Sequence, residues 1–255
     1  MSMKKFIKLV LCVAALAIPV RALCSSAWVN RAFVGAGDYV QIDDGVYAAR
    51  DLPPEERRRA LAALRDARGR IAETFGVPVA RPLTIIAAND REAARFGLAD
   101  DVPGTAFISP LRTEVVLNLA HFSIDVTAHE LVHAEVAQRL GVWTRAVELP
   151  VWFDEGVAVQ LDRRGPYLVD CGAVGEQRIR EVRQLTSVRR FWHGDRGQIV
   201  RNYQAAKCAA AEVLERHPPR TLYASLARLT RGEHFDDVFG AAPATPRTAD
   251  LTDPR

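Results

Sequence analysis

Residues 129–133 read His-Glu-Leu-Val-His, a pattern whose residue types and spacing suit hydrolytic metal chemistry. Because four residues make about one helical turn, both imidazoles of a helix with this sequence lie on one face, close enough to share one zinc ion. Glu130 then projects beside them, where a carboxylate can act as a general base. The same short pattern also arises by chance, as a buried histidine pair or a surface coincidence, so its surroundings decide the interpretation.

A catalytic zinc takes three protein ligands and keeps one position open for water. Glu155 follows His133 by 22 residues, within the segment Pro150–Gly156, whose proline is suited to open a second helix. We expect Glu155 to be the third ligand. Asp154 is adjacent but points to a different side of such a helix, and His193 is the other competitor.

Together the two segments resemble the gluzincin metallopeptidases, the group that includes thermolysin and the zinc aminopeptidases. The resemblance rests on His129-Glu130-x-x-His133 followed by Trp152-Phe153-Asp154-Glu155-Gly156. It implies one Zn2+ ion bound by His129, His133 and Glu155, with Glu130 as the general base, and a peptide or protein as substrate. The spacer is a little longer than in well-known members, and Asp154 stands where Asn is frequent.

The segment ahead of the zinc helix departs from one branch of this family. Zinc aminopeptidases carry Gly-x-Met-Glu-Asn there, and its Glu binds the free amine of the substrate. The comparable stretch here, Gly104-Thr105-Ala106-Phe107-Ile108, has no acid, so the resemblance favours an endopeptidase over an aminopeptidase. In the family the strand before the zinc helix also pairs with extended substrate, for which an unpaired strand edge offers the backbone groups.

Amide hydrolysis also needs a donor aimed at the developing negative oxygen. The stretch 203–207, Tyr-Gln-Ala-Ala-Lys, resembles a helix start of the zinc aminopeptidases whose Tyr hydroxyl steadies the oxyanion, although the family's Gly is missing. Tyr203 is therefore the first candidate and His193 the second, while a half-buried Tyr that only packs is the alternative. Val159 replaces the acid that supports the zinc ligands in thermolysin-like members, so we expect Asp162 or a backbone carbonyl to do this.

The first 27 residues read as a secretory signal. A lysine-rich start precedes an apolar run at 9–20 that is too short for a comfortable membrane span, and residues 25–27 are small enough for cleavage. We therefore expect a periplasmic or secreted protein. A lipid anchor on Cys24 is the alternative, although Leu23 is a poor neighbour for one. Membrane association is expected only through this anchor or an uncleaved signal.

Charge and cysteine usage agree with export. Removing the signal takes away four basic residues and no acid, so the net charge of +3 becomes −1. Without a basic run interleaved with aromatics, nucleic acid is not an expected partner. Cys171 and Cys208 are then an even pair in a chain bound for an oxidising compartment, and we predict a disulfide between them, with two buried free thiols as the alternative.

The surrounding pattern predicts the elements that position these residues. Apolar spacing indicates strands at 32–50, 82–87, 104–109 and 113–119, a helix at 53–75 whose arginines form a solvated surface, and a short helix at 90–97. Asp125 is expected to cap the zinc helix and Gly141 to stop it. A loop at 163–173 leads into a helix near 174–185, a long helix ending before Pro218, two shorter helices, and a disordered tail at 241–255.

These elements predict an α+β fold of the zincin-like metallopeptidase type. We expect a small, mostly antiparallel sheet with a covering helix, the zinc helix, and a helical C-terminal lobe, all within a peptidase domain at 28–240. Two other functions stay open: a catalytically inactive zincin-fold binding protein, and a zinc hydrolase of non-peptide, cell-wall amides. Intact Glu130 argues against the first, and glycan-binding aromatics at Trp143, Trp152 or Trp192 would favour the second.

Overall fold

The computed structural model describes residues 26–240 of the 255-residue chain. Residues 1–25 of the expected signal at 1–27, with Cys24, and the predicted disordered tail at 241–255 lie outside the described residues. The chain divides into two compact units. Among the described residues the first unit holds 26–73, 77–138 and 161–164, and the second holds 74–76, 139–160 and 165–240. No helix among residues 26–240 is long and apolar enough to cross a membrane.

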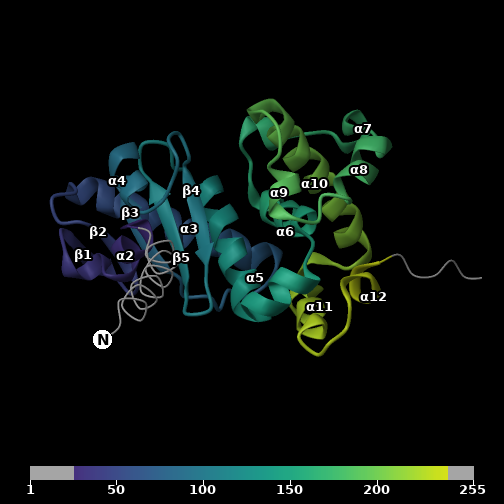
Figure 1. The fold of residues 1–255 in the computed structure, drawn as a ribbon, viewed down its shortest axis with the longest axis horizontal. Coiled ribbons are helices and arrows are strands. Elements are labelled where there is room, and N and C mark those ends of the chain that lie inside the picture. Colours follow the sequence, from purple (N-terminus) through teal and green to yellow (C-terminus); the bar gives the residue numbers. More distant parts are fainter. Residues whose placement is uncertain (1–25, 241–255) are drawn as a thin grey trace, which may run out of the picture. The chain divides into compact units, whose positions relative to one another are not determined.

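The first unit is built on a five-stranded sheet with the order β1-β2-β3-β5-β4 (Figure 1). Its strands are Tyr39–Asp43 (β1), Val46–Ala49 (β2), Leu83–Ala87 (β3), Gly104–Ile108 (β4) and Thr113–Asn118 (β5). The outer pairs β1–β2 and β4–β5 are antiparallel, whereas β2–β3 and β3–β5 are parallel. The predicted α+β class is confirmed, but the expectation of a mostly antiparallel sheet is wrong because the sheet is mixed.

The connections explain the parallel pairs. Helix α3 (Pro54–Thr74) links β2 to β3. Such a helical crossover brings the chain back to the end of the sheet at which β2 began, so that β3 runs parallel to β2. Between β3 and β5 the chain forms helix α4 (Asp90–Arg95) and edge strand β4 before it turns back into β5. Strand position was therefore predictable from local apolar runs, while strand direction depended on how the connections pack.

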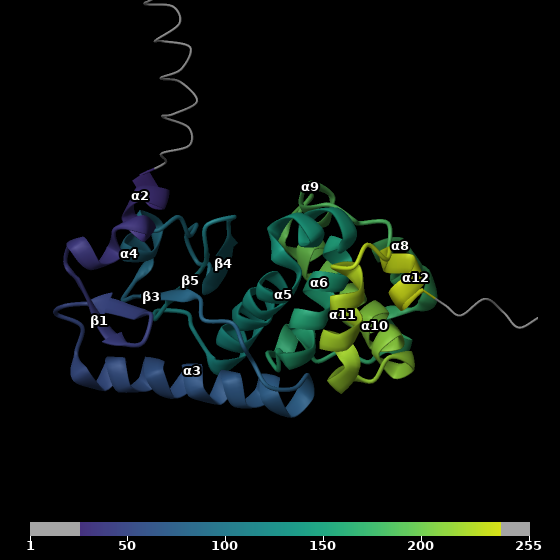
Figure 2. The ribbon, with the colours of Figure 1, turned by 90° about the horizontal axis from the view of Figure 1, so that it is seen from below.

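The centre of the sheet forms the core of the first unit. The fully buried side chains of β3 and β5 are Ile85, Ile86, Ala87, Val115, Val116, Leu117 and Asn118. Helix α3 runs along one side of the sheet (Figure 2), and its buried residues Ala60, Leu64, Ala67 and Ile71 recur at the helical period.

A short N-terminal helix, α2 (Ser26–Ala32), and the 3-10 turn Val34–Ala36 precede the sheet. Arg31 of α2 is buried and donates from Nε to Glu114 Oε2 at 2.6 Å and from Nη1 to the Phe96 carbonyl at 2.6 Å. Its guanidinium also lies 3.9 Å from the centre of the Phe107 ring. The segment directly after the expected signal is thus tied to the sheet by a buried ion pair.

Helix α5 (Ile124–Glu148) carries the histidine pattern, and its start corrects one prediction. Ser123, not Asp125, caps it, because the Ser123 hydroxyl accepts the Val126 N–H at 3.2 Å. Asp125 lies inside the first turn and binds Arg70 Nη1 at 2.6 Å instead. Gly141 breaks the helix as expected, with φ 72° and ψ 160°, although helical backbone resumes beyond it to Glu148.

The second unit is helical, as predicted for the C-terminal lobe. After α6 (Val151–Ala158) come α7 (Cys171–Val174), α8 (Glu176–Val182), α9 (Val188–Phe191), the long α10 (Arg196–Arg216), α11 (Leu222–Leu229) and α12 (Phe235–Phe239). Short 3-10 segments lie at Val159–Leu161, Gly165–Tyr167 and Pro219–Thr221. The helix expected near 174–185 is present as α8, which begins after Gly175, where a φ of 82° separates it from α7. Cys171 begins α7 instead of lying in the expected loop.

Candidate metal centre

His129 and His133 lie one turn apart on α5, and both are buried with 6% of their surface exposed. Their Nε2 atoms are 3.2 Å apart, and their ring centres are 4.9 Å apart. Two nitrogens at about 2.0–2.1 Å from a tetrahedral zinc would be roughly 3.3–3.4 Å from each other. The two imidazoles therefore converge at a spacing that suits shared coordination of one ion.

Glu130 lies between these histidines in sequence and contacts the edge of the sheet. Its Oε2 accepts a hydrogen bond from the main-chain N–H of Ala106 in β4 at 2.8 Å. Gly104 of the same strand leaves the room this needs, because a Cβ at that position would lie 3.3 Å from Glu130 Cγ. The proposed base is thus held by a backbone donor of β4.

Glu155 lies on α6 and is buried, with 4% of its surface exposed. One ligand atom from each of His129, His133 and Glu155 lies within 4.8 Å of the other two. The competing carboxylate, Asp154, forms an ion pair with Arg145 and is equally buried. Within residues 26–240, His129, His133 and Glu155 thus form one of two groups of side chains that could hold a metal ion, and Asp154 belongs to neither group.

The strand expected to border the site needs a correction. β5, which directly precedes α5, lies between β3 and β4, so both of its edges are occupied. The edge strand on this side of the sheet is β4, one strand earlier in the sequence. The Ala106 N–H points away from β5 toward Glu130, so the outward-facing backbone of β4 lies beside the proposed base.

The two candidates for the oxyanion donor lie in the second unit. Tyr203 on α10 is partly buried in an aromatic cluster, with ring centres 5.6 Å from Tyr167 and 5.2 Å from Phe191. His193 lies on the exposed turn after α9. It belongs to neither of the two groups of metal-ligating side chains found within residues 26–240, so its candidacy as a zinc ligand gains no support.

Asp162, the expected partner for a zinc ligand, is fully buried and bound elsewhere. Its carboxylate accepts from the main-chain N–H of Arg164 at 3.0 Å and from Arg164 Nε at 2.9 and 3.0 Å. The bonds of Asp162 thus stay within the loop, and its carboxylate pairs with the guanidinium of Arg164.

Gly156, which follows Glu155, is explained by packing. A Cβ there would lie 2.4 Å from the Ala206 carbonyl oxygen and 2.7 Å from Ala210 Cβ on α10. Gln160 adds two donated bonds, to the Gly156 carbonyl at 2.9 Å and to the Lys207 carbonyl at 2.8 Å. Helix α6 can therefore approach α10 closely only because residue 156 has no side chain.

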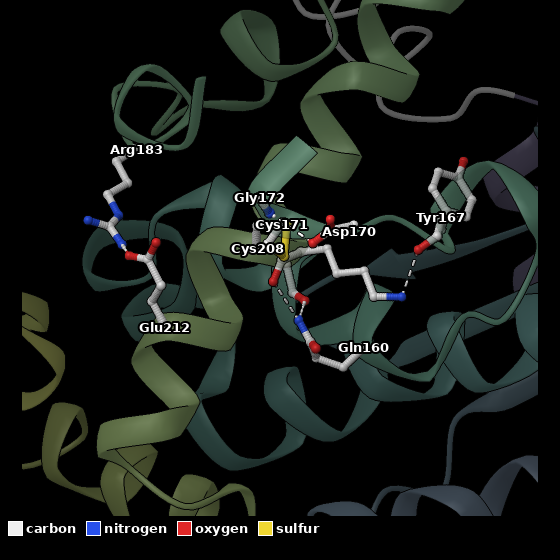
Figure 3. The surroundings of a disulfide bond; sticks show 10 residues. Gln160, Tyr167, Asp170, Cys171, Gly172, Arg183, Cys208 and Glu212 are labelled. Carbon is white, nitrogen blue, oxygen red and sulfur yellow. Dashed lines mark hydrogen bonds and ion pairs between the residues drawn. A yellow bond between two sulfur atoms is a disulfide. The ribbon is translucent and has the colours of Figure 1, made fainter. Parts of the chain in front are cut away.

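The predicted disulfide is confirmed. The sulfurs of Cys171 and Cys208 are 2.11 Å apart, and the bond attaches α7 to α10 (Figure 3). Beside it, Asp170 caps α7 by accepting the Gly172 N–H at 3.0 Å, and Lys207 Nζ donates to the Tyr167 carbonyl at 2.7 Å. Helix α10, which packs against the Glu155 helix α6, is thus covalently joined to α7, the next α-helix after α6 in the chain.

The sequence analysis missed a second group of metal-ligating side chains, Asp90, Asp101 and His121. His121 Nε2 is 3.1 Å from Asp90 Oδ1 and 3.9 Å from Asp101 Oδ1. A hydrogen bond from the Asn118 side chain, and a second from His121, lower the pKa of Asp90 below its usual value. Asp90 follows β3 and His121 follows β5, so only the parallel pairing of these strands could have indicated their proximity.

We compared the chain with protein-family models, with curated proteins and with solved structures, and none of the three comparisons gave a match. The gluzincin resemblance therefore rests on the residues of the two motifs.

Proposed function

We propose that this protein is an exported zinc-dependent metallopeptidase of the gluzincin type. The observation that carries the proposal is the 3.2 Å separation of the His129 and His133 Nε2 atoms beside the Glu130 carboxylate. Nothing in helix formation requires two buried imidazoles to converge with a carboxylate next to them. A hydrolytic metal site requires all three.

The ligands in this proposal are His129, His133 and Glu155, whose ligand atoms lie within 4.8 Å of one another. Two imidazoles and one carboxylate form the donor set of many catalytic zinc sites and leave a position for water. A zinc ion held there would lower the pKa of a bound water and polarise the scissile carbonyl.

Glu130 acts as the general base in this mechanism. It takes the proton of the attacking water and later delivers it to the leaving amine. The hydrogen bond from the Ala106 N–H fixes the direction of the carboxylate, because one oxygen stays bound to β4. A base held in one orientation loses less entropy when the reaction begins.

Substrate pairs with the outward edge of β4 as an additional strand in this proposal. An extended peptide would bond to backbone groups there, with alternate side chains pointing to either face. Residues 104–108 contain no carboxylate to bind a free amine, which supports endopeptidase over aminopeptidase activity. Tyr203, with His193 as the second candidate, donates to the oxyanion.

Export is part of the proposal. The apolar start of the sequence and the Cys171–Cys208 disulfide both suit a periplasmic or secreted protein. A disulfide persists in an oxidising compartment and is rare where glutathione keeps thiols reduced.

Zinc content and proteolysis test the proposal together. Purified mature protein is analysed for metal as wild type and as Glu155→Ala, and wild type and Glu130→Gln are assayed on an unstructured protein. We expect near-stoichiometric zinc that falls in Glu155→Ala, and cleavage that disappears in Glu130→Gln while zinc stays bound. Absence of zinc from wild type purified without chelators would overturn the proposal.

A second candidate is a zinc hydrolase of non-peptide amides in cell-wall material. The exposure of Trp143 (75%) and Trp192 (38%) favours it, because exposed indole rings can stack on sugars. Trp152 is buried and contributes to the core instead. Zinc without proteolysis, but with release of amine from cell-wall fragments, would support this candidate. Zinc without any hydrolysis would indicate a zincin-fold binding protein.

A further inference from the structure

The first unit contains a cavity of about 290 Å3 away from the histidine pair. It lies where the turn between β1 and β2, the middle of α3 and the start of β3 meet. Three arginines line it, Arg65 and Arg68 from α3 and Arg81 from the segment before β3. Asp43 and Asp44 line the same cavity from the turn.

The arginines outside this cavity behave differently from those inside it. On α3, Arg58 pairs with Glu55, Arg59 pairs with Glu56, and Arg70 pairs with Asp125. Within residues 26–240, none of the three cavity arginines forms an ion pair with a carboxylate. The expectation that all the α3 arginines form a solvated surface is thus too simple, because three of them are paired and Arg68 faces a cavity.

Arg68 is the most constrained of the three. It is half-buried, and its Nη1 donates to the Ala80 carbonyl at 3.2 Å. The Ala80 N–H in turn donates to the buried Glu135 Oε1 at 2.6 Å, so the backbone that holds Arg68 is itself fixed. Burial, together with the nearby charge of Arg81, lowers the pKa of Arg68. The charges of Glu135, Asp43 and Asp44 act on Arg68 in the opposite direction. The cavity lining itself holds three guanidinium groups and two carboxylates, so it carries one net positive charge.

We propose that this cavity binds a small oxyanion, with Arg65, Arg68 and Arg81 holding its oxygens. Guanidinium groups bind carboxylate and phosphate oxygens through paired, charge-assisted hydrogen bonds. The carboxylates of Asp43 and Asp44 would repel a second anionic group on the ligand, and they can accept hydrogen bonds from it. The ligand in this proposal therefore carries one anionic group for the arginines and a hydrogen-bond donor for the aspartates. Phosphate and an amino-acid carboxylate share this chemistry.

Equilibrium dialysis of the mature protein with labelled inorganic phosphate, and separately with labelled glycine, tests the proposal at constant ionic strength. The variants are Arg65→Ser and Arg81→Ser, both at exposed positions, and Arg91→Ser is the matched control at an exposed arginine outside the cavity. Equal unfolding midpoints for the variants and wild type establish that each is folded.

We expect saturable binding of one equivalent of phosphate or glycine, weakened about tenfold by each cavity substitution and unchanged in the control. The probe that binds more tightly identifies the ligand as phosphoryl or carboxylate. Failure of both probes to saturate, or equal binding by the cavity variants and the control, overturns the proposal. Because neither zinc nor hydrolysis is measured, this result is independent of the proposed peptidase activity.

Discussion

The main-chain N–H of Ala106 donates a hydrogen bond of 2.8 Å to the carboxylate of Glu130, joining the edge strand to the histidine-bearing helix. This donor faces away from β5, so it can be removed without breaking a bond of the sheet.

Ala106→Pro is expected to lower the proposed activity by about tenfold, the effect of losing one charge-assisted hydrogen bond to the base. The measurement is kcat on an unstructured protein, with zinc content as a check that the metal site is retained. Ile108→Pro is the control, because residue 108 has the same outward orientation two residues along β4. Equal losses in both variants would mean that the edge strand, not the bond to Glu130, matters.

Removing the charge of Glu155 and removing that of Asp154 should change different properties of the protein. Glu155→Gln is expected to reduce zinc occupancy, because a neutral amide is a poorer ligand than a carboxylate. Asp154→Asn should retain zinc but lower stability, since Arg145 would lose its buried partner. Metal analysis and denaturant unfolding of both variants check this. Loss of zinc in Asp154→Asn alone would exchange the two roles.

Gly156→Ala is expected to destabilise the second unit by about 1–3 kcal/mol, because its methyl group would press on α10. The contact at risk is the 2.4 Å approach to the Ala206 carbonyl oxygen. Gly69→Ala on α3 is the matched control, since nothing lies within 4 Å of its added Cβ. It should leave stability unchanged or raise it by about 0.5–1 kcal/mol. Urea unfolding followed by circular dichroism distinguishes the two.

The disulfide is expected to stabilise the protein by about 2–4 kcal/mol, because it closes a loop between residues 37 apart. Cys171→Ser with Cys208→Ser should lower the free energy of unfolding by this amount. Wild type under reducing conditions should approach the double variant, whereas the variant itself should not respond to reductant. If reductant also lowered the stability of the double variant, the loss of stability on reduction would not come from the Cys171–Cys208 disulfide.

The free energy of unfolding is expected to fall at alkaline pH because of Tyr39. Its buried hydroxyl donates to Glu92 Oε2 at 2.6 Å, and burial followed by this bond raises its pKa well above the usual range. The unfolded chain loses this proton above about pH 10 while the folded chain keeps it, so stability falls as the pH rises through that range. Tyr39→Phe should flatten the decline. Urea unfolding at successive alkaline pH values measures the slope, and equal slopes would refute the assignment.

The sequence by itself determined the features that depend on neighbours along the chain. Spacing within one helix places His129 and His133 one turn apart, and apolar runs locate the five strands and the main helices. The Cys171–Cys208 pair followed from counting the cysteines that remain once the expected export signal is removed. These inferences hold because helix period, strand alternation and composition act over a few residues.

Tertiary structure alone decided which distant segments meet. The parallel direction of β3 and β5 depends on crossover packing, and this direction also brings Asp90 to His121. The bond from Ala106 to Glu130 depends on β4 being the edge strand. Ser123 caps α5, while Asp125 inside the first turn binds Arg70, a residue 55 positions earlier. No local pattern records such contacts, since the energy that selects them comes from burial and hydrogen bonding between segments far apart in the chain.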